Sequence, residues 1–298
     1  MPKSLIGKTG EMQRCVLIIL AFAECCSCRN SLKTAPLRGV CCSVSFSGNR
    51  SYISPQFLSA FIPSFTPLSR TANMAAAPPA PNLSIGVILL DNHELLDSTG
   101  PIDLLTNISH HFLSQLPQTE AFLPLAPRLT WHYISHSLSP MSATGGPQLL
   151  PTTTYTTCPP LDVLIVPGPD ALAPLRDDEK EFIIARVEQV QAVLAVCSGS
   201  IALAKAGVLA GKSAMSNKIL LKAVGKDVAF GARWVYKGRW MRDGKIWTCG
   251  GVTAGMDMTA AWMLENFDNA MVKWSFEVAE FEPKEGGWSG FDYLTEDV

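Results

Sequence analysis

The 298-residue chain has the composition of an ordinary globular protein, with 47% hydrophobic and 17% charged residues and a formal net charge of −2. That charge is unevenly distributed, because residues 1–82 contain eight Lys and Arg against two acids, whereas residues 83–298 contain 16 basic and 24 acidic residues. The acidic body has no basic stripe, which argues against a nucleic-acid partner.

Residues 1–82 are predicted to form a non-globular N-terminal extension. The apolar run at 15–23 is shorter than the roughly 20 residues that span a bilayer, so no membrane contact is expected. Its flanks resemble a secretory signal, and the acid-poor, Arg- and Ser-rich stretch after it is typical of a mitochondrial transit segment. If Met74, which opens "MAAAPPAPNLSIGVILL", is the true start, we expect a cytoplasmic protein.

The cysteines support the same division of the chain. Six precede residue 82, and their spacing does not match a structural zinc site, so no metal is expected there: Cys15, Cys25, Cys26, Cys28, Cys41 and Cys42. Only Cys158, Cys197 and Cys249 lie in the body. Three widely spaced cysteines do not form a disulfide framework, so the body suits a reducing compartment.

Strands and helices alternate along residues 83–298, which we predict to be one domain. Buried or alternating strands are expected at 83–90, 129–135, 161–168 and 192–196. Helices are expected from Gly100-Pro101, at 177–190, after Cys197 and at 253–267. Turn-rich residues 142–155 indicate a hairpin excursion, and 232–249 an antiparallel ribbon with turns at Lys237-Gly238 and Asp243-Gly244. This alternation predicts an α/β fold with a doubly wound, mostly parallel sheet between helices.

The segment "AVCSG" places Cys197 between a predicted strand and a predicted helix. Ala195 and Gly199 flank it at positions that must be small where a sharp strand-to-helix turn exposes a nucleophile. The N–H groups of the helix beginning at Ser198 favour the thiolate, and Ser198 adds a hydroxyl beside the sulfur. The alternative is that Cys197 is a small buried apolar residue, as most unpaired cysteines are.

A carboxylic acid is the expected partner of this thiol. All five histidines precede Cys197: His93, His110, His111, His132 and His136. His132 and His136 lack a third ligand, so no metal site is expected there. Asp97 follows the first strand, in a connection that can face the same crevice as Cys197, and burial would raise its pKa. Alternatively, Asp97 only caps a helix that opens at Gly100-Pro101.

Four stretches between about 84 and 270 resemble the DJ-1/PfpI superfamily, with its class I glutamine amidotransferase-like fold, and within it the isonitrile hydratase-like branch. They are "IGVILLDNHELLDSTGPIDLL", "CPPLDVLIVPG", "AVCSGSIALAKAGVLAGKSA" and "RDGKIWTCGGVTAGMD". The resemblance implies a flavodoxin-like sandwich, a homodimer and no cofactor. It also implies that Cys197 is the nucleophile, Asp97 the acid/base and Ser198 the counterpart of a Thr beside the nucleophile.

Two departures from the family pattern concern the expected substrate-binding residues, which are Gly168, Pro169, Gly199 and Asn217. The family usually has Gly-Gly where this chain has Gly168-Pro169, and proline has no N–H to offer an oxyanion hole. Lower activity or a different substrate is therefore expected. Asn217 stands in a segment where the bacterial hydratases carry His-Trp, and it either binds substrate or caps the helix "KILLKAV".

Three functions fit these residues. The leading hypothesis is a cysteine-dependent lyase that adds water to a small electrophile such as an isonitrile and yields an N-formyl amine. A glyoxalase- or deglycase-like activity on 2-oxoaldehydes is the second, although those relatives generally carry a Glu in the strand-one region and often a His near the thiol, and neither occurs in the matching places. The third is a non-catalytic dimer that senses oxidants through Cys197.

Overall fold

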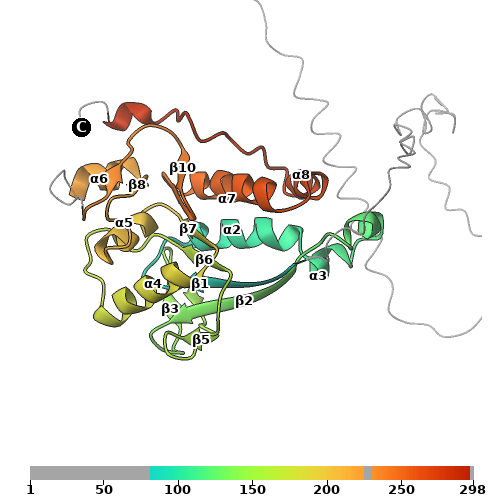
Figure 1. Ribbon diagram of the computed structural model, residues 1–298, viewed down its shortest axis with the longest axis horizontal. Helices are drawn as coiled ribbons and strands as arrows, with labels where there is room; N and C mark the ends of the chain where they lie inside the picture. Colours follow the sequence, from blue (N-terminus) through green and yellow to red (C-terminus); the bar gives the residue numbers. More distant parts are fainter. Residues whose placement is uncertain (1–80, 225–229, 296–298) are drawn as a thin grey trace, which may run out of the picture. The chain divides into compact units, whose positions relative to one another are not determined.

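The computed structural model describes residues 81–224 and 230–295 (Figure 1). The predicted extension, with its six cysteines and Met74, lies outside the described residues except for residues 81 and 82. None of the helices in the described part of the chain is both long and apolar enough to cross a bilayer.

A seven-stranded sheet forms the centre of the domain, in the order β10-β11-β7-β6-β1-β2-β5. The strands are β1 (Asn82–Ile88), β2 (Arg128–Ser135), β5 (Thr153–Thr154), β6 (Val163–Val166), β7 (Ala192–Ala195), β10 (Trp240–Asp243) and β11 (Ile246–Cys249). All neighbours pair in parallel except β10 and β11. The predicted doubly wound, flavodoxin-like sheet is therefore confirmed.

Helices cover both faces of this sheet (Figure 1). On one face, α2 (Leu95–Asn107), α7 (Thr253–Asn266) and α8 (Asn269–Val278) pack on Val87, Ile165 and Leu194. On the other, α4 (Asp177–Gln189) and α5 (Gly199–Lys205) pack on the alternate residues Leu164, Val166 and Val193. Because successive strand residues face opposite sides, a sheet buried on both faces needs the continuous apolar runs seen in the sequence.

The start of α2 differs from the prediction. Gly100 and Pro101 lie inside this helix, which begins at Leu95. Pro101 has no N–H to bond the carbonyl four residues earlier, which is that of Asp97, so the helix loses one internal bond there. Gly100 is needed for packing, since a Cβ there would lie 2.9 Å from the Cγ of Met256 in α7. Close packing of α2 on α7 therefore outweighs the local Gly-Pro signal.

The smaller elements confirm the hairpin excursion and correct the ribbon. Strands β3 (Met141–Ser142) and β4 (Gln148–Leu149) pair antiparallel outside the main sheet. In the ribbon, only the turn at Asp243-Gly244 joins antiparallel strands, β10 and β11. The segment before Lys237-Gly238 forms β9 (Arg233–Trp234), which instead pairs in parallel with β8 (Ser213–Ala214). Beyond these lie α3 (His110–Leu113), α6 (Lys218–Val224) and 3-10 helices at Pro117–Phe122 and Asp292–Thr295.

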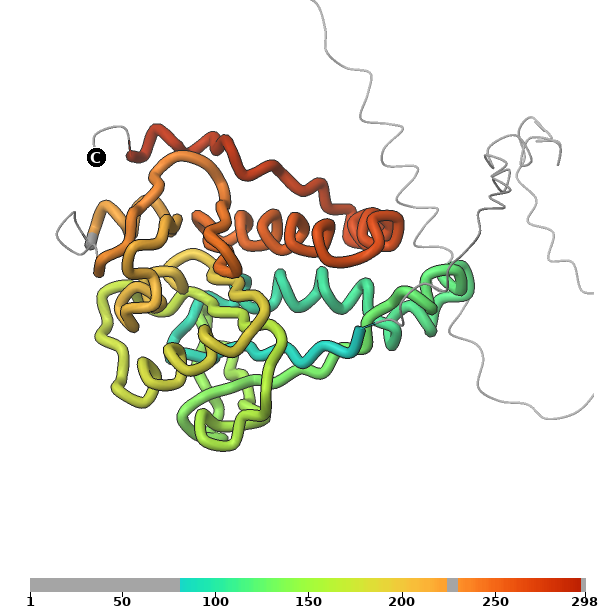
Figure 2. The backbone as a smooth tube through the Cα atoms, in the orientation of Figure 1, coloured from blue at the N-terminus to red at the C-terminus, as the bar shows by residue number. Residues whose placement is uncertain are grey.

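Residues 281–295, named here the C-terminal strap, run back from α8 along α7 towards α6 (Figure 2). Polar contacts fix the strap along its length. The backbone N–H of Lys284 donates to Asp257 at 2.8 Å, and the carbonyl of Gly286 accepts the N–H of Arg239 at 2.7 Å. Near its end, Asp292 accepts the N–H of Gly238 at 2.9 Å.

Candidate active site

The candidate active site lies beyond the carboxyl ends of three adjacent strands. Asp97 follows β1, Gly168 follows β6 and Cys197 follows β7, and these strands are neighbours in the order β7-β6-β1. After β1 the chain first adds β2 on one side and later β6 on the other, so the strand order reverses at β1. Such switch points leave a crevice between the loops in which α/β proteins bind ligands.

Cys197 occupies a tight bend between β7 and α5. Its φ of +55° lies in the left-handed region, which is rare for residues other than glycine. The carbonyl of Cys197 accepts hydrogen bonds from Ser200 Oγ at 2.9 Å and Ser216 Oγ at 2.8 Å, and these hold the bend. A Cβ at Gly199 would lie 2.0 Å from the carbonyl oxygen of Val166, so the position must be glycine, in line with the predicted need for a small residue.

Asp97 is completely buried in the first turn of α2. Its Oδ2 accepts the N–H of Gly168 at 3.0 Å, whereas its Oδ1 has no hydrogen-bond partner in the described part of the chain. Burial, aided by the charge of Glu94, raises the pKa of Asp97 to about 7, against the opposing effect of the Gly168 N–H. The capping alternative is wrong, because the helix starts at Leu95 and Asp97 already lies within it.

Gly168 lies between Asp97 and Ser198, the residue that follows Cys197. A Cβ at this position would lie 2.8 Å from Asp97 Oδ2 and 2.5 Å from Ser198 Oγ, so only glycine allows both groups to approach. Ser198 donates its hydroxyl to the carbonyl of Pro169 at 2.6 Å. Since the Gly168 N–H is engaged by Asp97 and Pro169 has none, this loop presents no free N–H from either residue.

Asn217 caps α6, which is one of the two roles predicted for it, and its side chain also contacts the candidate nucleophile. Its Oδ1 accepts the N–H groups of Ile219 at 3.1 Å and Leu220 at 3.2 Å, which caps the first turn of α6. Its side-chain amide also hydrogen-bonds the sulfur of Cys197, which lowers the pKa of the thiol. One amide group therefore links the start of α6 to the candidate nucleophile.

The ionisation of Cys197 differs from the prediction. Burial and the nearby Asp97 carboxylate raise the pKa of the thiol to about 12, although the backbone of Ser198 and the side chains of Asn217 and Ser198 act in the opposite direction. The side chain is only 5% exposed. The short helix α5 therefore does not hold a free thiolate, and the sulfur keeps its proton unless a neighbouring base accepts it.

Sequence reasoning missed several supporting residues. Glu94 donates its N–H to the carbonyl of Gly168 at 2.8 Å, and its carboxylate accepts the hydroxyl of Thr144 at 3.1 Å. Thr144 belongs to the hairpin excursion, and no local pattern connects it to this loop. Cys249 is fully buried at the end of β11, where its thiol donates to the carbonyl of Ala195 at 3.8 Å, two residues before Cys197. Only the pairing of β11 with β7 places Cys249 there.

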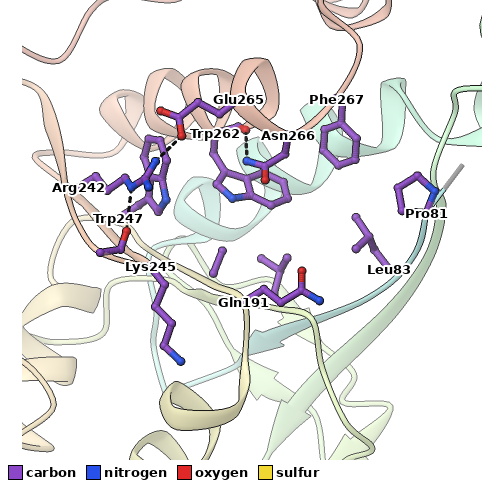
Figure 3. A pocket seen from close by; sticks show the side chains of 13 residues that line it. Pro81, Leu83, Gln191, Arg242, Lys245, Trp247, Trp262, Glu265, Asn266 and Phe267 are labelled. Carbon is purple, nitrogen blue, oxygen red and sulfur yellow. Dashed lines mark hydrogen bonds and ion pairs between the residues drawn. The ribbon is translucent and has the colours of Figure 1, made fainter. Parts of the chain in front are cut away.

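A separate cavity of about 380 Å³ lies at the amino ends of β1, β6 and β7, the ends opposite to those that carry the candidate site (Figure 3). Trp247, Trp262 and the Arg242–Glu265 ion pair line it, and Figure 3 shows both tryptophans on the same side of the opening. None of the candidate site residues contributes to its walls. This cavity is therefore not the site of thiol chemistry.

Comparison with known families decides the relationship suggested by these residues. Residues 84–265 match the DJ-1/PfpI family, a range that includes Asp97, Gly168, Cys197 and Asn217. The chain belongs to the DJ-1/PfpI family. Isonitrile hydratase from Pseudomonas putida is similar to it, with 35% identity over 213 residues that cover 69% of this chain and 82% of the relative.

Solved structures agree with this family assignment. A THiJ/PfpI family protein from Pseudomonas syringae is 25% identical with a TM-score of 0.58, and the match covers 75% of this chain and 83% of that one. DJ-1beta from Drosophila melanogaster shares the fold at 17% identity, with a TM-score of 0.53 and coverage of 67% and 99%. The resemblance stated from the sequence is thus confirmed.

The burial of Asp97 predicts a measurable effect on stability. The folded protein holds this proton more tightly than the unfolded chain, whose carboxyl has the usual pKa of 3.8. Stability should therefore fall as the pH rises from about 4 to about 7 and stay lower above that range. We expect Asp97→Asn to raise the free energy of unfolding at pH 8 by about 2–4 kcal/mol, since Asn carries no charge to desolvate.

Urea unfolding of both proteins at pH 4.5 and pH 8 measures this effect. The difference should be much smaller at pH 4.5, where Asp97 is protonated in the folded state and the pH is only slightly above the pKa of 3.8 of the unfolded chain's carboxyl. Asp103→Asn, at an exposed position of the same helix, is the matched control and should change stability little at either pH. An Asp97→Asn variant that is equally stable or less stable at pH 8 would contradict a raised pKa at this residue.

Proposed function

We propose that this protein is an isonitrile hydratase-like lyase that converts a small organic isonitrile and water into an N-formyl amine. The observation that carries the proposal is the buried Asp97 carboxyl beside Cys197, with Oδ1 unpartnered and a pKa of about 7. A group of that pKa can take and return a proton near neutrality. The Pseudomonas putida isonitrile hydratase, at 35% identity, supports the same reaction class.

In the first step, the sulfur of Cys197 adds to the terminal carbon of the isonitrile. Ionised Asp97 accepts the S–H proton as the C–S bond forms and delivers it to the same carbon. One C–S and one C–H bond form, the S–H bond breaks, and the triple bond becomes a C=N double bond. The product of this step is a thioimidate on Cys197, and Asp97 is again ionised.

In the second step, water hydrolyses the thioimidate. Asp97 accepts a proton from the water as its oxygen adds to the thioimidate carbon, and passes that proton to the imidate nitrogen. The tetrahedral intermediate then collapses: Asp97 takes the hydroxyl proton as the formyl C=O forms, the C–S bond breaks, the proton passes to the sulfur, and the N-formyl amine leaves. The overall balance is one isonitrile and one water consumed, with no oxidant, reductant or cofactor required.

The loop at Gly168-Pro169 favours an isonitrile over a 2-oxoaldehyde. Attack of a thiol on a carbonyl creates an oxyanion that an enzyme stabilises with N–H donors. Here the Gly168 N–H is used by Asp97 and Pro169 has none. Addition to an isonitrile creates no oxyanion in its first step, so that step does not need the donor that is missing.

The ionisation of Cys197 also bears on the redox alternative. Peroxide reacts with thiolates, and sensor cysteines combine a low pKa with solvent access. Cys197 has a raised pKa and only 5% exposure, so it fits a nucleophile activated by a base better than a peroxide sensor. We also propose that the protein is a homodimer, needs no cofactor and meets its small-molecule substrate in the cytoplasm. Sedimentation velocity of the purified protein tests whether it is a dimer.

Side-by-side assays of the purified protein test the proposed reaction. We expect formamide production from an alkyl isonitrile at a rate well above buffer, and lactate production from methylglyoxal no faster than in buffer. Infrared loss of the isonitrile band and chromatography of the formamide measure the first, and a lactate assay measures the second. Turnover of methylglyoxal without turnover of the isonitrile would reverse the assignment.

A further inference from the structure

A second cavity, of about 270 Å³, is lined by none of the residues used by the proposed mechanism. One of its wall residues, Asn217, follows Ser216, whose hydroxyl donates to the carbonyl of Cys197 at 2.8 Å. Its walls come from the start of α6, the segment that leads into α7 and the C-terminal strap. The apolar lining residues are Ile219, Val252, Ala254, Phe291 and Leu294. The volume is near the lower end of the range for small-molecule sites, which suits a ligand of few atoms.

Asn217 connects this cavity to the thiol. Its side chain lines the cavity, and its amide hydrogen-bonds the sulfur of Cys197. Gly251, on the facing wall, lies so close that a Cβ there would be 3.2 Å from Asn217 Nδ2. Asn217 is therefore the side chain that both lines the cavity and contacts the sulfur of Cys197.

The charges around the cavity are already neutralised. Lys218 donates to the carbonyl of Gly238 at 2.6 Å and lies 3.4 Å from Asp292. Arg239 forms an ion pair with Asp257 and a hydrogen bond of 3.1 Å to Thr253. Both cations are at least nine-tenths buried, so each is held by its own partner and neither is left to attract an anion.

We propose that this cavity binds the organic substituent of the substrate and selects a neutral alkyl or aryl group. The inference rests on the proposed function, because the substituent meant here is the organic group bonded to the nitrogen of the isonitrile. The strap is then a specificity element, because Phe291 and Leu294 form the wall that the substituent contacts. Burial of each additional methylene in such a wall should strengthen binding until the cavity is full.

Alkylation of Cys197 tests the cavity without relying on hydration. The full chain is treated with iodoacetamide, N-methyl, N-butyl and N-benzyl iodoacetamide, and iodoacetate, and the Cys197 peptide is quantified by mass spectrometry. In each reaction a C–S bond forms and iodide leaves. Rates are divided by those of glutathione with the same reagent. We expect N-butyl iodoacetamide to react about tenfold faster than iodoacetamide on this scale, and iodoacetate to show no advantage.

Two variants locate the effect. Ile219→Trp places a large ring at an exposed wall position and should bring the N-butyl advantage down to about twofold or less. Phe291→Ala opens the wall and should move the preference from N-butyl towards N-benzyl. Ile184→Trp, the same exchange at an exposed position of α4, is the matched control and should keep the wild-type ratio.

A flat series, in which all neutral reagents react alike, would overturn the cavity proposal, and so would a preference for iodoacetate. Absence of Cys197 alkylation by every reagent would also overturn it, because the cavity would then not lead to the sulfur. These outcomes are separate from the proposed function. A preference for longer alkyl reagents without isonitrile turnover would support the cavity proposal and reject the proposed reaction. Isonitrile turnover with equal alkylation rates for all neutral reagents would support the reaction and reject the cavity proposal.

Discussion

Replacement of Cys197 by Ala is expected to lower kcat for isonitrile hydration by about 10⁴-fold or more, because it removes the sulfur that forms the C–S bond in the proposed mechanism. Formamide production measures the loss. Cys197→Ser should be almost as inactive, since a hydroxyl is far less acidic than a thiol and Asp97, with a pKa of about 7, is a weak base towards it. Intact-mass analysis during turnover of the wild type should detect a thioimidate, heavier than the protein by one substrate molecule.

The control for this prediction is another buried thiol. Cys158 lies before β6, outside the candidate site, and Cys158→Ser should keep at least half of the wild-type kcat. Circular dichroism and the urea midpoint show whether each variant is folded. A folded Cys197→Ala variant that retains wild-type turnover would reject covalent catalysis by this residue.

The pH dependence of kcat/KM should report Asp97. The reactive form carries one proton on the Cys197–Asp97 pair, with the thiol protonated and the carboxyl ionised. Below pH 7, Asp97 takes up a second proton and can no longer accept the one on sulfur. For a neutral isonitrile, kcat/KM should therefore fall about tenfold per pH unit on the acid side of an apparent pKa near 7, and it should be level above that.

Asp97→Asn removes the base but keeps an oxygen to accept the Gly168 N–H. We expect kcat/KM at pH 8 to drop about 10²–10⁴-fold and the limb near pH 7 to disappear. Activity should instead rise with pH up to 10, because the thiolate then forms only by ionisation of a thiol whose pKa burial still raises without the Asp97 charge. Retention of the limb near pH 7 in the variant would assign it to another group.

Glu94→Gln is a control that tests why the pKa of Asp97 is raised. The Glu94 carboxylate raises the pKa of Asp97 through its charge, while its oxygen accepts the hydroxyl of Thr144. Gln keeps the acceptor and removes the charge. The acid limb should therefore move to lower pH, with the plateau within a few-fold of the wild type.

Replacement of Asp97 is expected to have opposite effects on stability and on activity. The same buried carboxyl that enables proton transfer costs the folded protein stability when it is ionised, so Asp97→Asn should be both more stable at pH 8 and less active. Such a trade-off is expected where a charged group is desolvated for function. It also distinguishes Asp97 from a helix cap, whose loss would lower stability.

The sequence alone was sufficient for the architecture, and it singled out Asp97, Gly168 and Cys197, which the structure brings together beyond the ends of β1, β6 and β7. Apolar strands such as 161–168, separated by amphipathic helices such as 177–190, predict a parallel sheet covered on both faces. The steric demand for small residues around Cys197 marks the bend, since Gly199 lies against the carbonyl of Val166. Both signals are local, because strand period and turn sterics depend on residues close in the chain.

Tertiary structure decided the chemistry of those residues. The Gly100-Pro101 pair predicts a helix start, yet packing against Met256 places it inside α2 and puts Asp97 in the buried first turn. The short helix after Cys197 predicts a lowered thiol pKa, yet burial and Asp97 raise it. Desolvation and charge–charge effects depend on which segments converge, and Asp97, Gly168 and Cys197 meet only because β1, β6 and β7 are neighbours in the sheet.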